Sequence, residues 1–274
     1  MKTVVITGSA RGLGFEMAKA FRTNGLNIVI SDLSKEKLAK AQKELEKIKS
    51  EARIGCCVCN VTKAEDIQQL IDYSKKEFGT IDIWINNAGV NQPEKAIWEL
   101  TEEEINLVLD VDLKGTIIAS KLIMQEFSKL HKGAIYNIEG YGSNDAKMLG
   151  LSIYGTSKRA VTYFTEALAK ENDVKNTGVI VGKLSPGIMI TDFIVNALGD
   201  KQTITLSEKT KKVYNILGDY PDVVAKFLVE GMLKNTKNNA KIEWLTTKKA
   251  AWRFMTAGFN KRDFFKNEPK LLNK

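Results

Sequence analysis

The chain has 274 residues, 43% of them hydrophobic, and carries a formal net charge of +8. This length and composition suit one α/β domain, and no apolar stretch approaches the roughly 20 residues of a membrane span, so we expect a soluble cytoplasmic protein. The positive charge does not indicate a nucleic-acid partner, because lysines and glutamates alternate in amphipathic patterns such as 35–49, which is typical of a solvated helix face.

Short apolar runs alternate with helical patterns along the whole chain. The expected strands cover 3–7, 26–31, 53–59, 81–86, 133–139, 177–185 and 241–245. The expected helices cover 12–24, 35–50, 64–78, 101–129, 152–170 and 221–234. Continuously apolar strands joined by helices predict a single domain with a doubly wound parallel sheet, a Rossmann fold of about seven strands with helices on both faces.

A glycine-rich turn follows the first expected strand and opens the first expected helix. Backbone N–H groups and the helix dipole favour an anion at such a helix start, and glycines let a phosphate approach the backbone. A tight strand-to-helix turn can also need glycine for its own geometry. The candidate phosphate-binding residues are Gly8, Arg11, Gly12, Leu13 and Gly14.

The second expected strand leads to Asp32. A carboxylate in this place can accept hydrogen bonds from the ribose hydroxyls of an adenosine, and it repels a 2′-phosphate. Because Leu33 follows rather than a basic residue, the sequence favours NAD over NADP, although Arg11 and Lys35 keep NADP open. Alternatively, Ser31, Asp32 or Ser34 caps the helix that begins at Lys35.

Tyr154 and Lys158 are four residues apart in an expected helix, so their side chains share one face. A free tyrosine has a pKa of about 10, and a nearby ammonium lowers that value and creates a usable general acid or base. The alternative is a tyrosine at the edge of the core beside a solvated lysine.

Four motifs occur in the order typical of one enzyme family. The segment 7–14 resembles the TGxxxGxG motif, 86–89 the NNAG motif, and 154–158 the YxxxK motif of the short-chain dehydrogenase/reductase family. The fourth is a proline-glycine segment that meets the nicotinamide in that family. Besides the glycine turn, Asp32 and Leu33, the resemblance implies cofactor contacts by Asn60, Val61, Asn87, Ala88, Gly89, Tyr154, Lys158, Pro186, Gly187 and Thr191.

The same resemblance implies a mechanism. A hydride moves between the nicotinamide and a carbinol carbon while Tyr154 exchanges the hydroxyl proton and Lys158 lowers the pKa of the tyrosine. A serine normally orients the substrate oxygen, yet Tyr141 or Gly140 stands in its place, depending on the alignment. We expect Ser143 to supply this hydroxyl unless Ser152 turns inward.

An asparagine in the long fourth helix usually completes a proton relay in this family, and Asp112 stands where it is expected. A carboxylate can hold a relay water in the same way. Alternatively, Asp110 and Asp112 are charges on the helix surface. Asn60 is a second departure, because the family usually has an aspartate there.

Two segments, 139–143 and 184–192, resemble the chlorophyll(ide) b reductase-like branch of the family, whose members act on large, flat apolar molecules. Because the chain shows no plastid-type transit sequence, we expect instead a bulky alcohol or ketone such as a steroid or bile acid. Apolar residues near the expected pocket agree with this size, although they could equally be core residues: Met148, Leu149, Leu151, Ile188, Met189 and Phe193.

The leading functional prediction is an NAD-dependent oxidoreductase that interconverts a secondary alcohol and a ketone. The alternatives are an NADPH-dependent carbonyl reductase and a dinucleotide-sensing protein without turnover. We expect a homo-oligomer, either a dimer or a tetramer. No metal site is expected, because adjacent cysteines on a strand point to opposite faces; the three are Cys56, Cys57 and Cys59.

The expected Rossmann domain covers 1–245 and includes a substrate lid at about 190–220. The remaining 246–274 form a C-terminal extension in which basic and aromatic residues interleave. Such a segment can pack on the domain, form a subunit contact, lie on a membrane surface or cover an anionic substrate.

Overall fold

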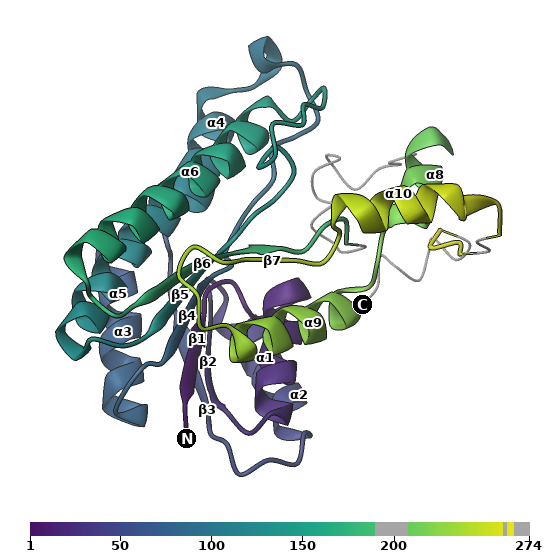
Figure 1. Cartoon of the computed structure of the whole chain (residues 1–274). Coiled ribbons are helices and arrows are strands. Elements are labelled where there is room, and N and C mark those ends of the chain that lie inside the picture. The colour runs from purple at the N-terminus through teal and green to yellow at the C-terminus, as the bar shows by residue number, and fades with distance from the viewer. Residues whose placement is uncertain (190–207, 260–261, 266–274) are drawn as a thin grey trace.

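The computed structural model describes residues 1–189, 208–259 and 262–265. Its centre is one sheet with strands in the order β3-β2-β1-β4-β5-β6-β7, and every neighbouring pair is parallel (Figure 1). The predicted doubly wound parallel sheet is therefore confirmed. The strands are β1 (Thr3–Ile6), β2 (Asn27–Asp32), β3 (Ile54–Val58), β4 (Ile83–Asn86), β5 (Ala134–Ile138), β6 (Ile180–Ser185) and β7 (Lys241–Glu243).

Helices cover both faces of the sheet because successive strand residues point to opposite sides. In β1, Val4 and Ile6 belong to one buried cluster and Val5 to the other. The first cluster lies under α1 (Gly12–Thr23), α2 (Lys35–Glu46) and α9 (Pro221–Lys234). The second lies under α3 (Ala64–Phe78) and α5 (Thr116–Leu130), and α6 (Ser152–Lys175) covers the same face (Figure 1).

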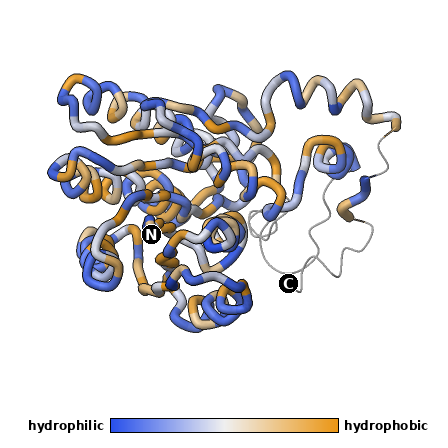
Figure 2. The backbone as a smooth tube through the Cα atoms, turned by 60° about the horizontal axis from the view of Figure 1, so that its bottom comes forward, coloured by the Kyte–Doolittle hydropathy of each residue, from blue (hydrophilic) through white to orange (hydrophobic). Residues whose placement is uncertain are grey.

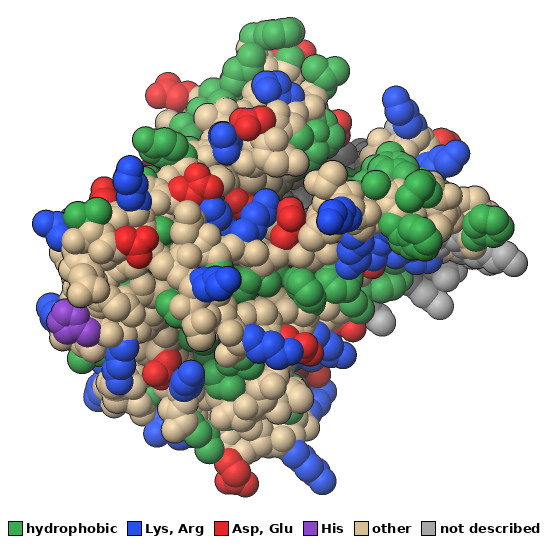
Figure 3. Space-filling view, viewed as in Figure 1, with side chains coloured by type: hydrophobic (Ala, Val, Ile, Leu, Met, Phe, Trp, Pro, Cys, Tyr) green, Lys and Arg blue, Asp and Glu red, His purple; other side chains and the backbone are tan. Residues whose placement is uncertain are grey.

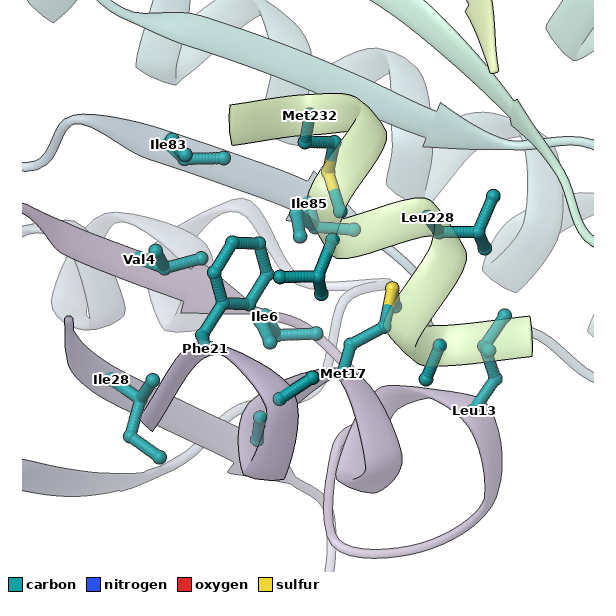
Figure 4. Packing of buried hydrophobic residues seen from close by; sticks show 14 of the residues in the cluster. Val4, Ile6, Leu13, Met17, Phe21, Ile28, Ile83, Ile85, Leu228 and Met232 are labelled. Carbon is teal, nitrogen blue, oxygen red and sulfur yellow. The ribbon is translucent and has the colours of Figure 1, made fainter. Parts of the chain in front are cut away.

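The larger cluster joins the first and last helices of the domain. Figure 4 shows Met17 and Phe21 of α1 packed between the sheet and Leu228 and Met232 of α9. Burying each such side chain contributes roughly 1.5–3 kcal/mol. Figure 2 shows hydrophilic and hydrophobic residues alternating along the helical coils of the chain, as is typical of amphipathic helices that pack on a sheet.

The predicted helix over 101–129 is interrupted. It consists of α4 (Glu102–Val108), a π-helical segment η2 (Leu109–Gly115) and α5. The wider π-helical turn occurs where the helix presses on the loop after β3, since a Cβ on Gly115 would lie 2.9 Å from the carbonyl oxygen of Val61. Such π-bulges are often found at functional sites.

Four short elements were not predicted from the sequence. They are α8 (Glu208–Leu217), α10 (Thr247–Met255), η1 (Ile97–Glu99) and η3 (Ala257–Phe259). Among the described helices none has the length and apolar character that a membrane crossing requires.

The chain order reverses between β1 and β4, which are neighbours in the sheet. The connections that leave the carboxyl ends of these two strands run to opposite sides. A crevice for a ligand is therefore expected at this edge, between the turn after β1 and the loop after β4.

Candidate active site

The turn after β1 and the loop after β4 are joined by reciprocal hydrogen bonds. The Thr7 hydroxyl accepts the backbone N–H groups of Asn87 and Ala88, each at 3.0 Å. In return, the Asn87 side-chain amide donates to the carbonyl oxygens of Thr7 and Gly8, each at 2.9 Å. Thr7 was not among the predicted site residues, although its place in the first motif is a signal for this role.

Two glycines of the first motif are required by close packing. Gly8 has a positive φ of 60°, and a Cβ there would lie 2.7 Å from Cα of Ala88. A Cβ on Gly14 would lie 2.5 Å from the side-chain nitrogen of Asn87. Any larger residue would therefore push the two loops apart.

The third glycine faces open space. Gly12 has a φ of 59°, and no atom lies within 4 Å of its Cβ position. It begins α1, which has no side-chain cap and no acidic residue in its first turn. Its N–H groups and helix dipole suit a phosphate. Of the two other predicted residues in this turn, Arg11 is exposed, whereas Leu13 is buried in the core.

Asp32 ends β2 at the same edge of the sheet and is partly exposed. One of its carboxylate oxygens accepts the N–H of Ser34 at 3.2 Å. The cap of α2 is Ser34, whose hydroxyl accepts the N–H of Lys37, so the alternative role of Asp32 as the helix cap is wrong. Leu33, the other predicted residue here, is exposed.

Two predicted cofactor contacts follow β3. The side-chain oxygen of Asn60 accepts both the N–H and the hydroxyl of Thr62, at 3.0 and 2.8 Å, and so closes a turn. Val61 is buried beneath η2. Contact of these residues with a cofactor stays a prediction.

Tyr154 and Lys158 lie on the same face of α6, as predicted, and both side chains are buried. The Lys158 Nζ lies 5.5 Å from the centroid of the Tyr154 ring. The pair stands beside the loop after β4, since a Cβ on Gly89 would lie 3.6 Å from the Lys158 Nζ.

Asp112 is the third buried member of this cluster. One carboxylate oxygen lies 2.9 Å from the Lys158 Nζ, and the other accepts the N–H of Val90 at 2.7 Å. The carboxylate is fully buried, so it is not a surface charge. Asp110 differs, because its side chain is half-exposed and pairs with Lys114.

The balance of charges around Tyr154 differs from the expectation. Burial raises the pKa of Tyr154 to about 12, an effect that Lys158 opposes and Asp112 reinforces. Burial also raises the pKa of Asp112, against the effect of Lys158. Burial disfavours the positive charge of Lys158. The interactions of this lysine with Asp112 and Tyr154 outweigh burial, so the pKa of Lys158 is raised. Lys158 thus acts in the expected direction, but burial outweighs its effect and Asp112 adds to the rise, so the pKa of Tyr154 lies above its ordinary value rather than below it.

The loop 139–143 packs directly on the first turns of α6. A Cβ on Gly140 would lie 2.3 Å from the Tyr154 Oη, so a serine there would displace the tyrosine. Gly142 has a φ of 96°, and a Cβ on it would lie 2.6 Å from Cα of Gly155. The glycines thus let the loop approach both the helix and the phenol.

Ser143 closes this loop. Its hydroxyl accepts the N–H of Gly140 at 3.1 Å and lies 3.3 Å from the carbonyl oxygen of Lys158, to which it donates. The hydroxyl of Tyr141 turns away and donates to the carbonyl of Lys147, and Ser152 is exposed. A catalytic role for Ser143 stays a prediction.

The proline-glycine segment follows β6. Gly187 has a φ of 73°, and a Cβ there would lie 2.6 Å from Cβ of Leu245, while Pro186 is buried. Thr191 and Phe193 lie outside the described residues, as does the 190–207 part of the predicted lid. The described part of the lid contains α8.

The predicted apolar pocket residues have different environments. Leu149 is 92% exposed and Met148 is also exposed, whereas Met189 packs against the core. Leu151 and Ile188 are partly exposed. Their contact with a substrate therefore stays a prediction.

Asp219 holds the start of the C-terminal extension on the domain. Its carboxylate binds the guanidinium of Arg253 at 2.6 Å and that of Arg262 at 3.2 Å, and it accepts the indole N–H of Trp244 at 2.7 Å. Outside this anchor, hydrophobic side chains gather on the outer surface of α10 (Figure 3), where Trp252 is 63% exposed. The extension therefore both packs on the domain and presents an apolar surface.

The strand order, the glycine turn after β1 and the buried tyrosine–lysine pair on α6 together define the architecture of a Rossmann-type dehydrogenase. A family model described as short chain dehydrogenase matches residues 2–202. The chain belongs to the short-chain dehydrogenase family, whose members are NAD(P)-dependent oxidoreductases.

Known proteins similar to this chain agree with that family. A probable chloroplastic chlorophyll(ide) b reductase of Arabidopsis thaliana is 30% identical over 99% of this chain and 56% of that protein. A chloroplastic chlorophyll(ide) b reductase of Oryza sativa subsp. japonica is 33% identical over 92% of this chain and 74% of that protein. The resemblance to this branch is therefore confirmed, and the chain spans about half the length of the Arabidopsis relative.

The fold is also found among solved structures. Levodione reductase superposes with a TM-score of 0.81 and 21% identity, over 91% of this chain and 98% of that one. This likeness concerns the fold alone.

Proposed function

We propose that the chain is an NAD(P)H-dependent carbonyl reductase that acts on a bulky apolar substrate, with Tyr154 as the proton donor. The buried cluster of Tyr154, Lys158 and Asp112 carries this proposal. A phenol with a pKa of about 12 keeps its proton across the physiological range, which suits a general acid. The similarity to chlorophyll(ide) b reductases supports the reductive direction.

The residues present fit the cofactor. The helix start at Gly12 offers backbone N–H groups and open space for a phosphate, and the joined loops carry Asn87 and Gly89 toward Lys158. Bound reduced nicotinamide supplies a hydride. Lys158 would hold the nicotinamide ribose, and the pair Pro186 and Gly187 would lie against the nicotinamide ring.

In the proton-transfer step, the Tyr154 Oη would donate its proton to the carbonyl oxygen of the substrate, and the bound reduced nicotinamide would supply the hydride for the carbonyl carbon. The products are the alcohol and the oxidised nicotinamide. The phenolate that remains is stabilised by the Lys158 ammonium, whose own charge is held by Asp112 at 2.9 Å. The phenolate then regains a proton from water.

NADH is the proposed preferred cofactor, because Asp32 ends β2 at the sheet edge where an adenosine ribose would lie, and Leu33 follows it. The carboxylate would accept hydrogen bonds from the ribose hydroxyls and would repel a 2′-phosphate. Arg11 is exposed in the turn after β1, the strand beside β2, and supports use of NADPH as a second cofactor.

For the substrate class, we propose a large, flat ring system that carries a carbonyl group. The similarity to two chlorophyll(ide) b reductases supports this class, and it favours a tetrapyrrole over the steroid or bile acid expected from the apolar residues alone. The exposed Met148 and Leu149 agree with a wide entrance.

The purified chain should be assayed with NADH and NADPH against chlorophyllide b, a ketosteroid and a small diketone, following the absorbance of the reduced nicotinamide. We expect turnover of a large ring substrate and a loss of roughly 100- to 10,000-fold in Tyr154→Phe, with cofactor binding retained. Turnover that Tyr154→Phe leaves intact would overturn the proposal, and cofactor binding without any turnover would indicate the sensor alternative.

A further inference from the structure

Gln92 is a fully buried polar residue in the loop after β4. Its side-chain oxygen accepts the backbone N–H groups of Ile153 at 2.7 Å and Tyr154 at 2.9 Å. Its side-chain nitrogen donates to the carbonyl oxygen of Gly150 at 2.7 Å. The amide therefore spans the entry to α6 and the first turn of that helix.

These bonds supply what the helix itself lacks. The first N–H groups of any α-helix have no partner within the helix, and a side chain at the cap position normally accepts one of them. In α6 the cap position is held by Leu151, which has no such group. The acceptor comes instead from Gln92, about 60 residues earlier in the chain.

The same loop also reaches the other half of the catalytic pair. The N–H of Val90 binds Asp112, and Asp112 binds Lys158. Residues 90–92 thus fix Tyr154 through its backbone and Lys158 through a carboxylate. This segment directly follows Asn87, Ala88 and Gly89, which are predicted to contact the cofactor.

We infer that Gln92 is a positioning residue for proton transfer: it sets the place of the Tyr154 phenol relative to Lys158 and to the cofactor loop. The inference rests on the proposed reductase function for its kinetic consequence. Its structural consequence, a well-ordered first turn of α6, does not depend on that function.

The test uses Gln92→Leu, Gln92→Glu and the matched control Asn172→Leu in the full chain. Asn172 is also a buried amide on α6, and its side chain donates to the carbonyl of Val179 at the opposite end of the helix. Hydrogen exchange measured by mass spectrometry reports the order of each helix end. Kinetics with NADH and the best substrate report kcat, KM and their pH dependence.

We expect Gln92→Leu to speed exchange in the first turn of α6 and to lower kcat by about 10- to 100-fold, because a small misplacement of a reacting group has effects of this size. The alkaline limb of its kcat profile should also move, while KM for NADH changes less than threefold. Gln92→Glu keeps an oxygen acceptor for both N–H groups, so its first turn should stay protected and its kcat should lie closer to that of the wild type.

Asn172→Leu should speed exchange at the carboxyl end of α6 and lower the melting temperature, with an unchanged pH profile. Equal melting-temperature losses in both leucine variants, with unchanged pH profiles, would overturn the inference. If the wild type turns over no substrate, the proposed reductase function fails, and hydrogen exchange alone then tests the role of Gln92. In that case, equal protection of the first turn of α6 in Gln92→Leu and in the wild type would overturn the inference.

Discussion

One carboxylate oxygen of Asp112 lies 2.9 Å from the Lys158 Nζ, and both side chains are almost completely buried. The ammonium is therefore shared between the carboxylate and the Tyr154 phenol. This arrangement makes the tyrosine a weaker acid than a tyrosine beside an unpaired lysine.

Replacing this carboxylate should lower the pKa of Tyr154. Asp112→Asn removes a negative charge that raises that pKa and leaves Lys158 free to act on the phenol. In the reductive direction activity requires the protonated phenol, so it is lost as pH rises through the pKa of Tyr154. The alkaline limb of kcat/KM should therefore move to lower pH.

The matched control is Asp110→Asn, which removes a half-exposed carboxylate two residues earlier. Its alkaline limb should coincide with that of the wild type. An Asp112→Asn profile that also coincides with the wild type would show that Asp112 does not control the proton donor.

Gly140 should not tolerate a side chain. In Gly140→Ala the new Cβ would meet the Tyr154 Oη at 2.3 Å, so the phenol must move and kcat should fall by at least about tenfold. Gly155→Ala is the control on α6, since its Cβ would find its nearest neighbour at 3.9 Å. It should instead stabilise the protein by about 0.5–1 kcal/mol, because alanine favours helix more than glycine. Steady-state kinetics and thermal unfolding separate the two effects.

Asp32 should decide the choice of cofactor. Asp32→Ala removes the proposed hydrogen-bond acceptor for the ribose and the repulsion of a 2′-phosphate. The preference for NADH, measured as kcat/KM with NADH divided by kcat/KM with NADPH, should therefore fall by about tenfold or more. A tenfold change is equivalent to about 1.4 kcal/mol. Asp72→Ala, an exposed carboxylate on α3, serves as the control. An unchanged ratio in Asp32→Ala would place the ribose elsewhere.

Asp219 should hold the C-terminal extension in place. In Asp219→Ala, Arg253 and the indole of Trp244 lose a largely buried partner, and removing one member of such a group costs about 3–5 kcal/mol. We expect faster tryptic cleavage after Lys248 or Lys249, followed by mass spectrometry. Asp222→Ala, an exposed carboxylate nearby, should leave the cleavage rate unchanged.

The sheet and most of its helices could be predicted from the sequence because buried parallel strands are continuously apolar and their crossovers are amphipathic. The predicted helices 64–78 and 221–234 agree with α3 and α9 at both ends. The long fourth helix was predicted as regular, because its periodicity does not reveal the contact between Gly115 and the carbonyl of Val61 that accompanies the π-helical turn.

The part of the site that lies within local motifs could be predicted from the sequence. The spacing of Tyr154 and Lys158 places both on one face, but it says nothing of a carboxylate that reaches Lys158 from another helix. For the same reason Gln92 escaped notice, since its partners lie about 60 residues away. Interactions of this kind depend on tertiary packing, which a pattern of local residues does not encode.

The π-helical segment η2 makes the site depend on the number of residues between two helices. An α-helix turns by about 100° per residue, so removing one residue between Leu109 and Gly115 would rotate one helix against the other by that angle. If α5 kept its packing on the sheet, α4 would have to reorient. If α4 kept its place, Asp112 would swing away from Lys158. A natural or engineered relative that lacks one residue ahead of Asp112 would therefore keep every motif of the family and still either displace α4 or lose the buried ion pair.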